Sequence, residues 1–278
     1  MTETLEPTGG RDDESLSPVV RRRGPGRRSS VTRSVGGILG ALGLWELISL
    51  SGVVGSEALA NVQDTGRALF TNAGSLGVAV GGTLEAWAIG LAVATAAGVV
   101  LGTLIGRSRI AEATTEVLVR AMRPLPSLAL IPIAILVAGL GLRMTTGLVA
   151  FTSFWPVFIN TRYGVRQVDI LIIDTGRTLG LRRLPLLAKV VVPAAAPLIA
   201  SGVQVAISLA LVVTVSVELV GGTGGIGSFV QTAQQANAVP TMYTGILVGG
   251  IVGWVLNAGY AAVIRRAIPW QARGEVSA

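Results

Sequence analysis

The chain has 278 residues, of which 51% are hydrophobic and only 13% charged, and its mean hydropathy is +0.67. A soluble domain carries about a quarter charged residues, so this composition excludes an ordinary soluble protein and predicts a membrane protein. The net charge is +7, and the absence of cysteine and histidine excludes disulfides, thiol nucleophiles and metal sites built from those residues.

The first segment, residues 1–33, is polar and contains seven arginines with proline, glycine and serine between them, which predicts a disordered basic tail. Six apolar runs follow, each close to the ~20 residues that a helix needs to cross a bilayer. The predicted spans are 34–54, 76–106, 124–142, 144–161, 194–217 and 241–264. The predicted fold is therefore an all-α, polytopic membrane protein, with a membrane domain over 34–268 and a short cytoplasmic tail over 269–278.

The placement of basic residues predicts the orientation in the membrane. If both termini are cytoplasmic, the inner segments hold 20 of the 22 Lys and Arg residues, and only Arg67 and Arg143 lie outside. Cytoplasmic segments carry such an excess, so the basic residues belong to topology rather than to nucleic-acid binding. The run Ala58-Leu59-Ala60 is similar to a signal-peptidase site, but the preceding apolar run is long for a cleaved signal.

The cytoplasmic segment 162–193 does not read as a simple loop, because apolar residues alternate there with arginine and aspartate. Gly180 is placed to end a first short helix in the left-handed conformation, and Pro185 is placed near the start of a second. Pro193 then marks the entry to the fifth span. Two short helices meeting at a bend could be a passive interfacial elbow or a knob that docks into a soluble partner.

The elbow carries a resemblance to a known family. The segment resembles the EAA motif of ABC importer permeases, in which Glu-Ala-Ala is usual. Here the motif begins with Asp174-Thr175-Gly176, Gly180 follows four residues later, and Pro193 follows after an apolar stretch. Gly176 replaces a helix-favouring alanine, at about 1 kcal/mol of helix propensity. Other segments resemble the nitrate, sulfonate and taurine branch of these permeases, namely 45–47, 101–109, 123–132, 154–161, Glu218 and 224–227.

The resemblance implies a six-helix permease of the type I importer class in a bacterial inner membrane. It implies a second permease copy, two ABC ATPase subunits inside and a substrate-binding protein outside. The single lysine, Lys189, is not in a Gly-Lys-Ser/Thr phosphate-binding loop, so ATP and Mg would be bound by the partner ATPase and this chain needs no cofactor, metal or catalytic residue. The implied substrate is a small anion such as a sulfonate, taurine or nitrate.

Two sets of candidate site residues follow from the motif and its surroundings. The resemblance implies coupling to the ATPase through Asp174, Thr175, Gly176, Arg177, Gly180, Leu181 and Pro193. The outer segment 221–240, expected to be a glycine-rich loop, supplies a candidate gate or pathway element with Glu218, Gly224, Gly225 and Gly227. Basic residues of the elbow could also contact membrane lipid.

Three acidic residues, Glu46, Glu85 and Glu218, lie in or near predicted spans, where carboxylates are costly and suggest function. They keep open a second class of function, an ion-coupled secondary transporter that works without an ATPase. A third class is a membrane scaffold that recruits a partner through the elbow. Gly98 and Gly102 form a small-xxx-small pair, which predicts close helix packing.

Overall fold

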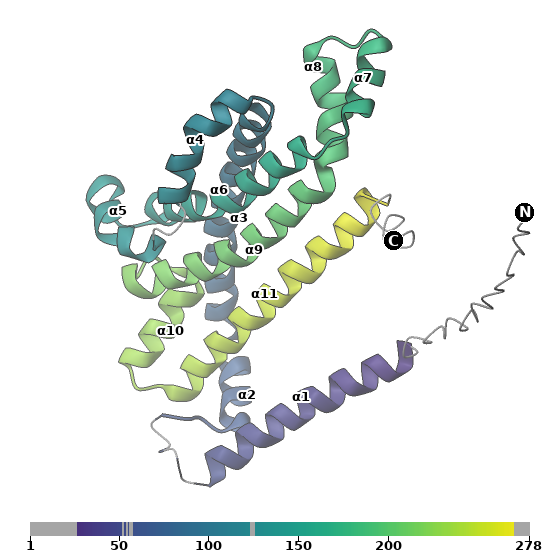
Figure 1. Cartoon of the computed structure of the whole chain (residues 1–278). Helices are drawn as coiled ribbons and strands as arrows, with labels where there is room; N and C mark the ends of the chain where they lie inside the picture. The colour runs from purple at the N-terminus through teal and green to yellow at the C-terminus, as the bar shows by residue number, and fades with distance from the viewer. Residues whose placement is uncertain (1–26, 52, 54, 56–57, 123–125, 270–278) are drawn as a thin grey trace, which may run out of the picture. The chain divides into compact units, whose positions relative to one another are not determined.

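The computed structural model describes residues 27–51, 53, 55, 58–122 and 126–269, and within these residues every regular element is helical, which confirms the all-α class (Figure 1). The predicted tail residues 1–26 and 270–278 lie outside the described residues. In chain order, the elements are α1 (Arg27–Leu50), α2 (Val62–Thr71), α3 (Ala73–Gly106), α4 (Arg109–Met122), the 3₁₀ helix η1 (Ser127–Leu130), α5 (Ile131–Ala138), α6 (Leu142–Arg166), α7 (Ile170–Thr178), α8 (Arg183–Leu186), the π-helix η2 (Leu187–Val191), α9 (Val192–Gly221), α10 (Gly225–Gln235) and α11 (Val239–Ala267).

Most of helix α1 belongs to a separate compact unit that ends at Leu47, and the rest of the chain forms a second unit. The helix begins at Arg27, so the last residues of the segment predicted as a tail are helical. The apolar stretch found among its described residues, Leu39–Leu50, lies within the predicted first span, 34–54.

Four helices among the described residues are long and apolar enough to cross a membrane: α3, α6, α11 and the continuous helix Arg183–Gly221 formed by α8, η2 and α9. A fifth candidate is a pair, Ala113–Met122 and Ser127–Ala138, which is bent by 83°. The predicted count of six spans is therefore not confirmed.

The third predicted span, 124–142, is wrong as a single membrane helix. Among the described residues of this segment, η1 and α5 join into one helix, Ser127–Ala138, which is shorter than the ~20 residues that a single helix needs to cross the bilayer. Gly139 and Gly141 adopt φ values of 71° and 131°, which stops the helix before α6 begins. Apolar composition alone does not distinguish a broken segment from a continuous span.

The core lies along α6, which packs against α3 on one side and α9 on the other. Glycines on α3 permit the close approach: a Cβ atom on Gly98 would lie 2.8 Å from Val157 Cγ1, and one on Gly102 would lie 2.8 Å from Phe158 O. On the other side, a Cβ atom on Gly202 of α9 would lie 2.8 Å from Pro156 O. The predicted packing role of Gly98 and Gly102 is confirmed.

This packing predicts the effect of adding one methyl group. Gly102→Ala is expected to destabilise the protein by about 1–3 kcal/mol, because the new Cβ meets backbone that cannot move aside. Gly77→Ala on the same helix is the matched control, since no atom lies within 4 Å of its added Cβ. Thermal unfolding of the purified protein in mild detergent measures both, and equal melting temperatures would contradict the close α3–α6 contact.

The segment expected as an outer loop, 221–240, contains the helix α10, which corrects that expectation. Gly222 ends α9 in the left-handed conformation, with φ of 57°. Ile226, Val230 and Ala233 then form a buried stripe at helical spacing. Within the second unit, α10 and α2 lie at one end of the long helices, and α7 and α8 lie at the other (Figure 1).

Candidate functional site

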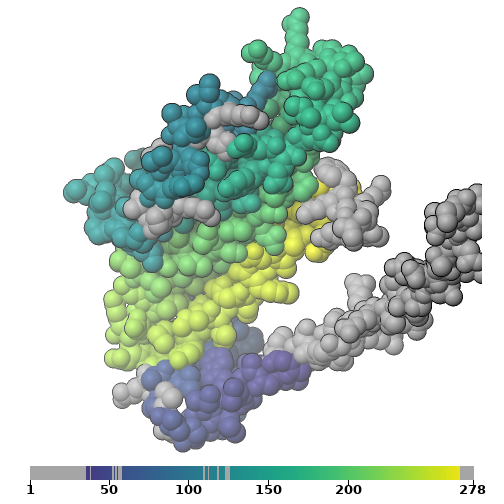
Figure 2. Space-filling model, viewed as in Figure 1, coloured from purple at the N-terminus to yellow at the C-terminus, as the bar shows by residue number. Residues whose placement is uncertain are grey.

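The predicted elbow forms two short helices joined by a tight turn, and it stands out from the ends of the long helices (Figure 2). Asp169 begins α7 as its N-cap, with its carboxylate accepting a 2.9 Å hydrogen bond from the Leu171 N–H. Gly180 ends α7 at φ of 79°. The Gly180 N–H donates to Arg177 O at 2.9 Å and the Leu181 N–H donates to Gly176 O at 3.1 Å, which is the Schellman arrangement.

Gly176 is buried where α7 packs on α8. A Cβ atom at this position would lie 2.6 Å from Leu186 Cδ1 and 3.6 Å from Leu181 Cδ1. The glycine that departs from the usual Glu-Ala-Ala therefore permits a close contact between the two helices.

The outward side of α7 is exposed. Asp174 Oδ1 and Arg177 Nη1 form an ion pair at 2.8 Å, and both side chains are more than half exposed, so the pair contributes little to stability. Thr175 donates its hydroxyl to Leu171 O, within the helix. Leu171 and Leu179 are 71% and 76% exposed, so the elbow presents an apolar outer surface.

Pro193 lies outside the α7–α8 turn, in the first turn of α9. The elbow is joined to this helix through the π-helix Leu187–Val191, and the helical run Arg183–Gly221 is 39 residues long. Movement of the elbow would therefore be transmitted along one continuous helix. Single-turn π segments often occur at functional positions.

At the opposite end, Glu218 is 2% exposed and joins three helices. Its Oε2 accepts a hydrogen bond from Thr83 Oγ1 of α3 and another from the Gly227 N–H of α10, both at 2.9 Å. The Ile226 N–H donates to Thr83 Oγ1 at 2.8 Å. The carboxylate thus lies at the N-terminus of α10, where the free N–H groups and the helix dipole favour negative charge.

The glycines around this carboxylate have different roles. A Cβ atom on Gly225 would overlap the Glu218 carboxylate, and one on Gly227 would overlap Val215 O. Gly224 adopts φ of 87° in the turn, with open space around it. The structure therefore brings Glu218, Gly225 and Gly227 into one contact, and leaves Gly224 as a turn residue.

Sequence reasoning missed Thr83 as the partner of Glu218. Thr83 is fully buried in a helix rich in alanine, glycine and leucine, but other polar residues such as Glu85 and Thr103 lie on the same helix, so no signal in the sequence singled it out. The other two acidic candidates do not share the site: Glu85 is exposed on α3 and Glu46 lies on α1.

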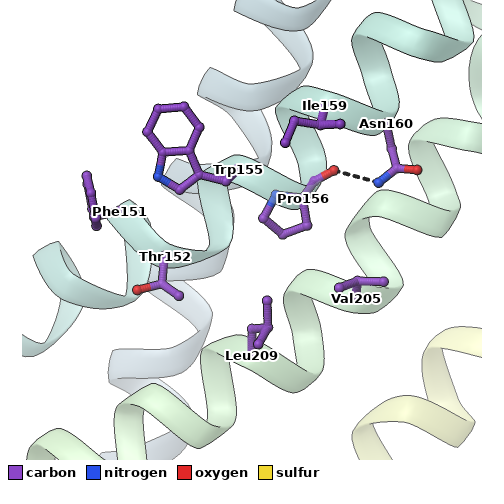
Figure 3. A pocket seen from close by; sticks show the side chains of 8 residues that line it. All are labelled: Phe151, Thr152, Trp155, Pro156, Ile159, Asn160, Val205 and Leu209. Carbon is purple, nitrogen blue, oxygen red and sulfur yellow. Dashed lines mark hydrogen bonds between the residues drawn. The ribbon is translucent and has the colours of Figure 1, made fainter. Parts of the chain in front are cut away.

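A cavity of about 470 Å³ lies between the middle parts of α6 and α9 (Figure 3). Its walls are apolar and aromatic with two uncharged polar side chains, and the lining residues are Phe151, Thr152, Trp155, Pro156, Ile159, Asn160, Val205 and Leu209. None of these described lining residues carries a charged side chain.

Local chemistry explains the polar groups of this cavity. Pro156 has no N–H and so cannot donate to the carbonyl of Thr152 one turn earlier. The Asn160 amide donates to Pro156 O at 2.8 Å, as Figure 3 shows. The buried Trp155 indole N–H has no hydrogen-bond acceptor among the described residues. Thr152 and Asn160 are therefore the neutral polar side chains that a small solute would meet in this cavity.

Comparison with known proteins gives a consistent result. The family model "Binding-protein-dependent transport system inner membrane component" matches residues 94–271. The bicarbonate transport system permease protein of Synechococcus elongatus is 32% identical over 232 residues, covering 80% of this chain and 84% of the relative. The nitrate import permease protein of Leptolyngbya laminosa is 30% identical over 190 residues, covering 68% of each.

The fold is similar to that of a solved structure, an inward-facing methionine ABC transporter. The TM-score is 0.55 at 16% identity, and the match covers 74% of this chain and 96% of that chain. At this identity the likeness concerns the fold alone.

Proposed function

Because the chain belongs to the family of inner membrane components of binding-protein-dependent transport systems, we propose that it is the permease subunit of an ATP-driven importer. The observation that carries the proposal is the elbow. Helix α7 has an exposed apolar surface and packs through Gly176 against Leu186, near the start of the continuous helix Arg183–Gly221, which is long and apolar enough to cross the membrane. Such a knob suits a groove on a soluble ATPase.

In the proposed assembly, two copies of this chain pair with two ABC ATPase subunits, and an extracytoplasmic binding protein delivers the substrate. ATP and Mg bind on the ATPase subunits, since this chain has no phosphate-binding loop. The excess of basic residues near the elbow supports a cytoplasmic position for the elbow and for both termini.

The proposed mechanism assigns a role to each part of the chain. The docking knob is formed by Asp174, Thr175, Gly176, Arg177, Gly180 and Leu181. Pro193 lies in the first turn of α9, where motion of the knob would be transmitted to that helix. ATP-driven closure of the ATPase subunits would move the knob and, through α9, the wall of the cavity formed by Val205 and Leu209. Glu218 with Gly225 and Gly227 would hold α10 in place at the outer end.

The proposed substrate is a small anion such as nitrate, bicarbonate, a sulfonate or taurine. Support comes from the nitrate and bicarbonate permeases among the relatives. The cavity between α6 and α9 carries no charge, so the choice of anion would rest with the binding protein.

The alternative, an ion-coupled secondary transporter, gains no specific support. Its best coupling residue, Glu218, is held by Thr83 and Gly227 at the start of α10 rather than directed into the cavity of Figure 3.

Transport assays separate the two functions. Proteoliposomes that contain this chain with its ATPase should take up labelled nitrate, bicarbonate or taurine only when ATP and the binding protein are both supplied. Uptake driven by a proton or sodium gradient in vesicles holding this chain alone would contradict the importer function.

A further inference from the structure

A second cavity lies at the root of the elbow, on the inner side of α7. Its volume is about 350 Å³, and it is bounded by the ends of α3 and α6, by α7 and by the start of the long helix that leads into α9. The lining residues are Gly106, Arg107, Val165, Arg166, Val168, Ile170, Ile173, Arg177, Leu186, Leu187 and Val191.

Three arginines from three helix ends meet at this cavity. Arg107 follows α3, Arg166 is the last residue of α6, and Arg177 lies in the last turn of α7. Each arginine could serve only to stabilise its own helix end, since a cation interacts favourably with the terminal carbonyl groups. That role does not explain why the three arginines border the same cavity. Among the described residues that line the cavity none is acidic, and Asp174, which pairs with Arg177, is not one of them. The cavity therefore favours an anion, and guanidinium groups suit the oxygens of a phosphate.

The walls narrow the choice of anion. Seven of the lining residues are valine, leucine or isoleucine. A free phosphate ion keeps its hydration and gains nothing from apolar walls. A phospholipid carries its phosphate next to a glycerol and acyl chains, so it matches charged and apolar groups in one site. The cavity also lies where long apolar helices end, the level of the lipid headgroups.

The cavity and the docking surface share Arg177 but otherwise use different residues of α7. Ile170, Ile173 and Arg177 follow helical spacing and line the cavity. Leu171 and Leu179 belong to the exposed outer surface and are absent from the lining. A molecule in the cavity would leave the outer surface of the elbow accessible to a protein partner.

We propose that the cavity at the root of the elbow binds the headgroup of one anionic phospholipid, with Arg107, Arg166 and Arg177 contacting the phosphate. The apolar walls contact the glycerol and the first part of the acyl chains. The bound lipid braces α7 against the ends of α3 and α6. This site is independent of the proposed transport function, since it uses groups of this chain and the membrane only.

Native mass spectrometry of the full-length chain in mild detergent tests the site with phosphatidylglycerol and phosphatidylcholine as the two probes. The chain should retain phosphatidylglycerol in preference to phosphatidylcholine. The double variant Arg107→Gln/Arg166→Gln should weaken retention by about five-fold for each arginine removed. The matched control, Arg67→Gln/Arg143→Gln, makes the same change of charge at residues that do not line the cavity, and should retain phosphatidylglycerol as the unaltered chain does.

A second measurement needs no variant. Phosphatidylglycerol should raise the melting temperature of the unaltered chain more than phosphatidylcholine does, because a ligand that binds the folded state stabilises it. Equal effects of the two lipids, or equal losses in the two double variants, would overturn the proposal. Displacement of the retained lipid by millimolar inorganic phosphate would assign the cavity to a free phosphate ion, and would also overturn it.

Discussion

Replacing Gly180 with proline is expected to abolish substrate uptake while the chain remains in the membrane. Proline fixes φ near −65°, whereas Gly180 adopts 79°, and proline also lacks the N–H that donates to Arg177 O. The Schellman turn would be lost, and α8 would no longer pack on Gly176. The long apolar helices do not depend on this turn, so membrane insertion should be unchanged. Uptake and membrane content, measured on the same cells, test the prediction.

Gly180→Asn is the matched control, because asparagine tolerates the left-handed conformation and the space around this position is open. It should retain most of the uptake. Asp174→Arg on the outer side of the same helix should reduce uptake without opening the turn, since it removes the partner of Arg177 and reverses a charge on the docking surface. Normal uptake by both Gly180→Pro and Asp174→Arg would rule out docking through the elbow.

Replacing Glu218 with leucine is expected to cause the largest loss of stability. The Gly227 N–H and the Thr83 hydroxyl would lose their acceptor in a buried site, at about 1–3 kcal/mol for each group left unsatisfied. The start of α10 would lose its anchor on α3 and α9. A fall in the melting temperature of the purified protein, together with reduced uptake, is the expected result.

Two further variants make this test specific. Glu85→Leu removes the same type of side chain from an exposed position on α3, and should leave the melting temperature nearly unchanged. Thr83→Val combined with Glu218→Leu should cost less than the sum of the single changes, because both act on one network. Fully additive effects would show that the contact contributes nothing to stability.

Much of the elbow could be predicted from the sequence, because local chemistry determines it. A glycine at a left-handed helix end and a proline near the next helix start act over a few residues, and the structure has both where they were expected. The close helix packing at Gly98 and Gly102 could also be predicted, since a spacing of four residues places both on one helix face.

Other features depend on contacts between distant parts of the chain. The hydrogen bond between Thr83 and Glu218 spans 135 residues, and no local pattern links the two. Helix α10 was expected to be a loop because glycines and polar residues surround its buried stripe. The third predicted span is shorter than expected because its helix begins at Ser127, after a bend of 83° from the preceding helix, and ends before Gly139, and composition does not reveal such a bend.

Purification of the full-length chain in a mild detergent, with mass spectrometry of the proteins that accompany it, tests the central claim most directly. The importer function predicts a co-purifying ATPase with a Gly-Lys-Ser/Thr phosphate-binding loop, in a ratio near one ATPase per permease chain. Gly180→Pro should lose this ATPase, and Gly180→Asn should keep it. Recovery of the unaltered chain without any ATPase, repeated under gentle conditions in which the chain stays folded, would contradict the claim.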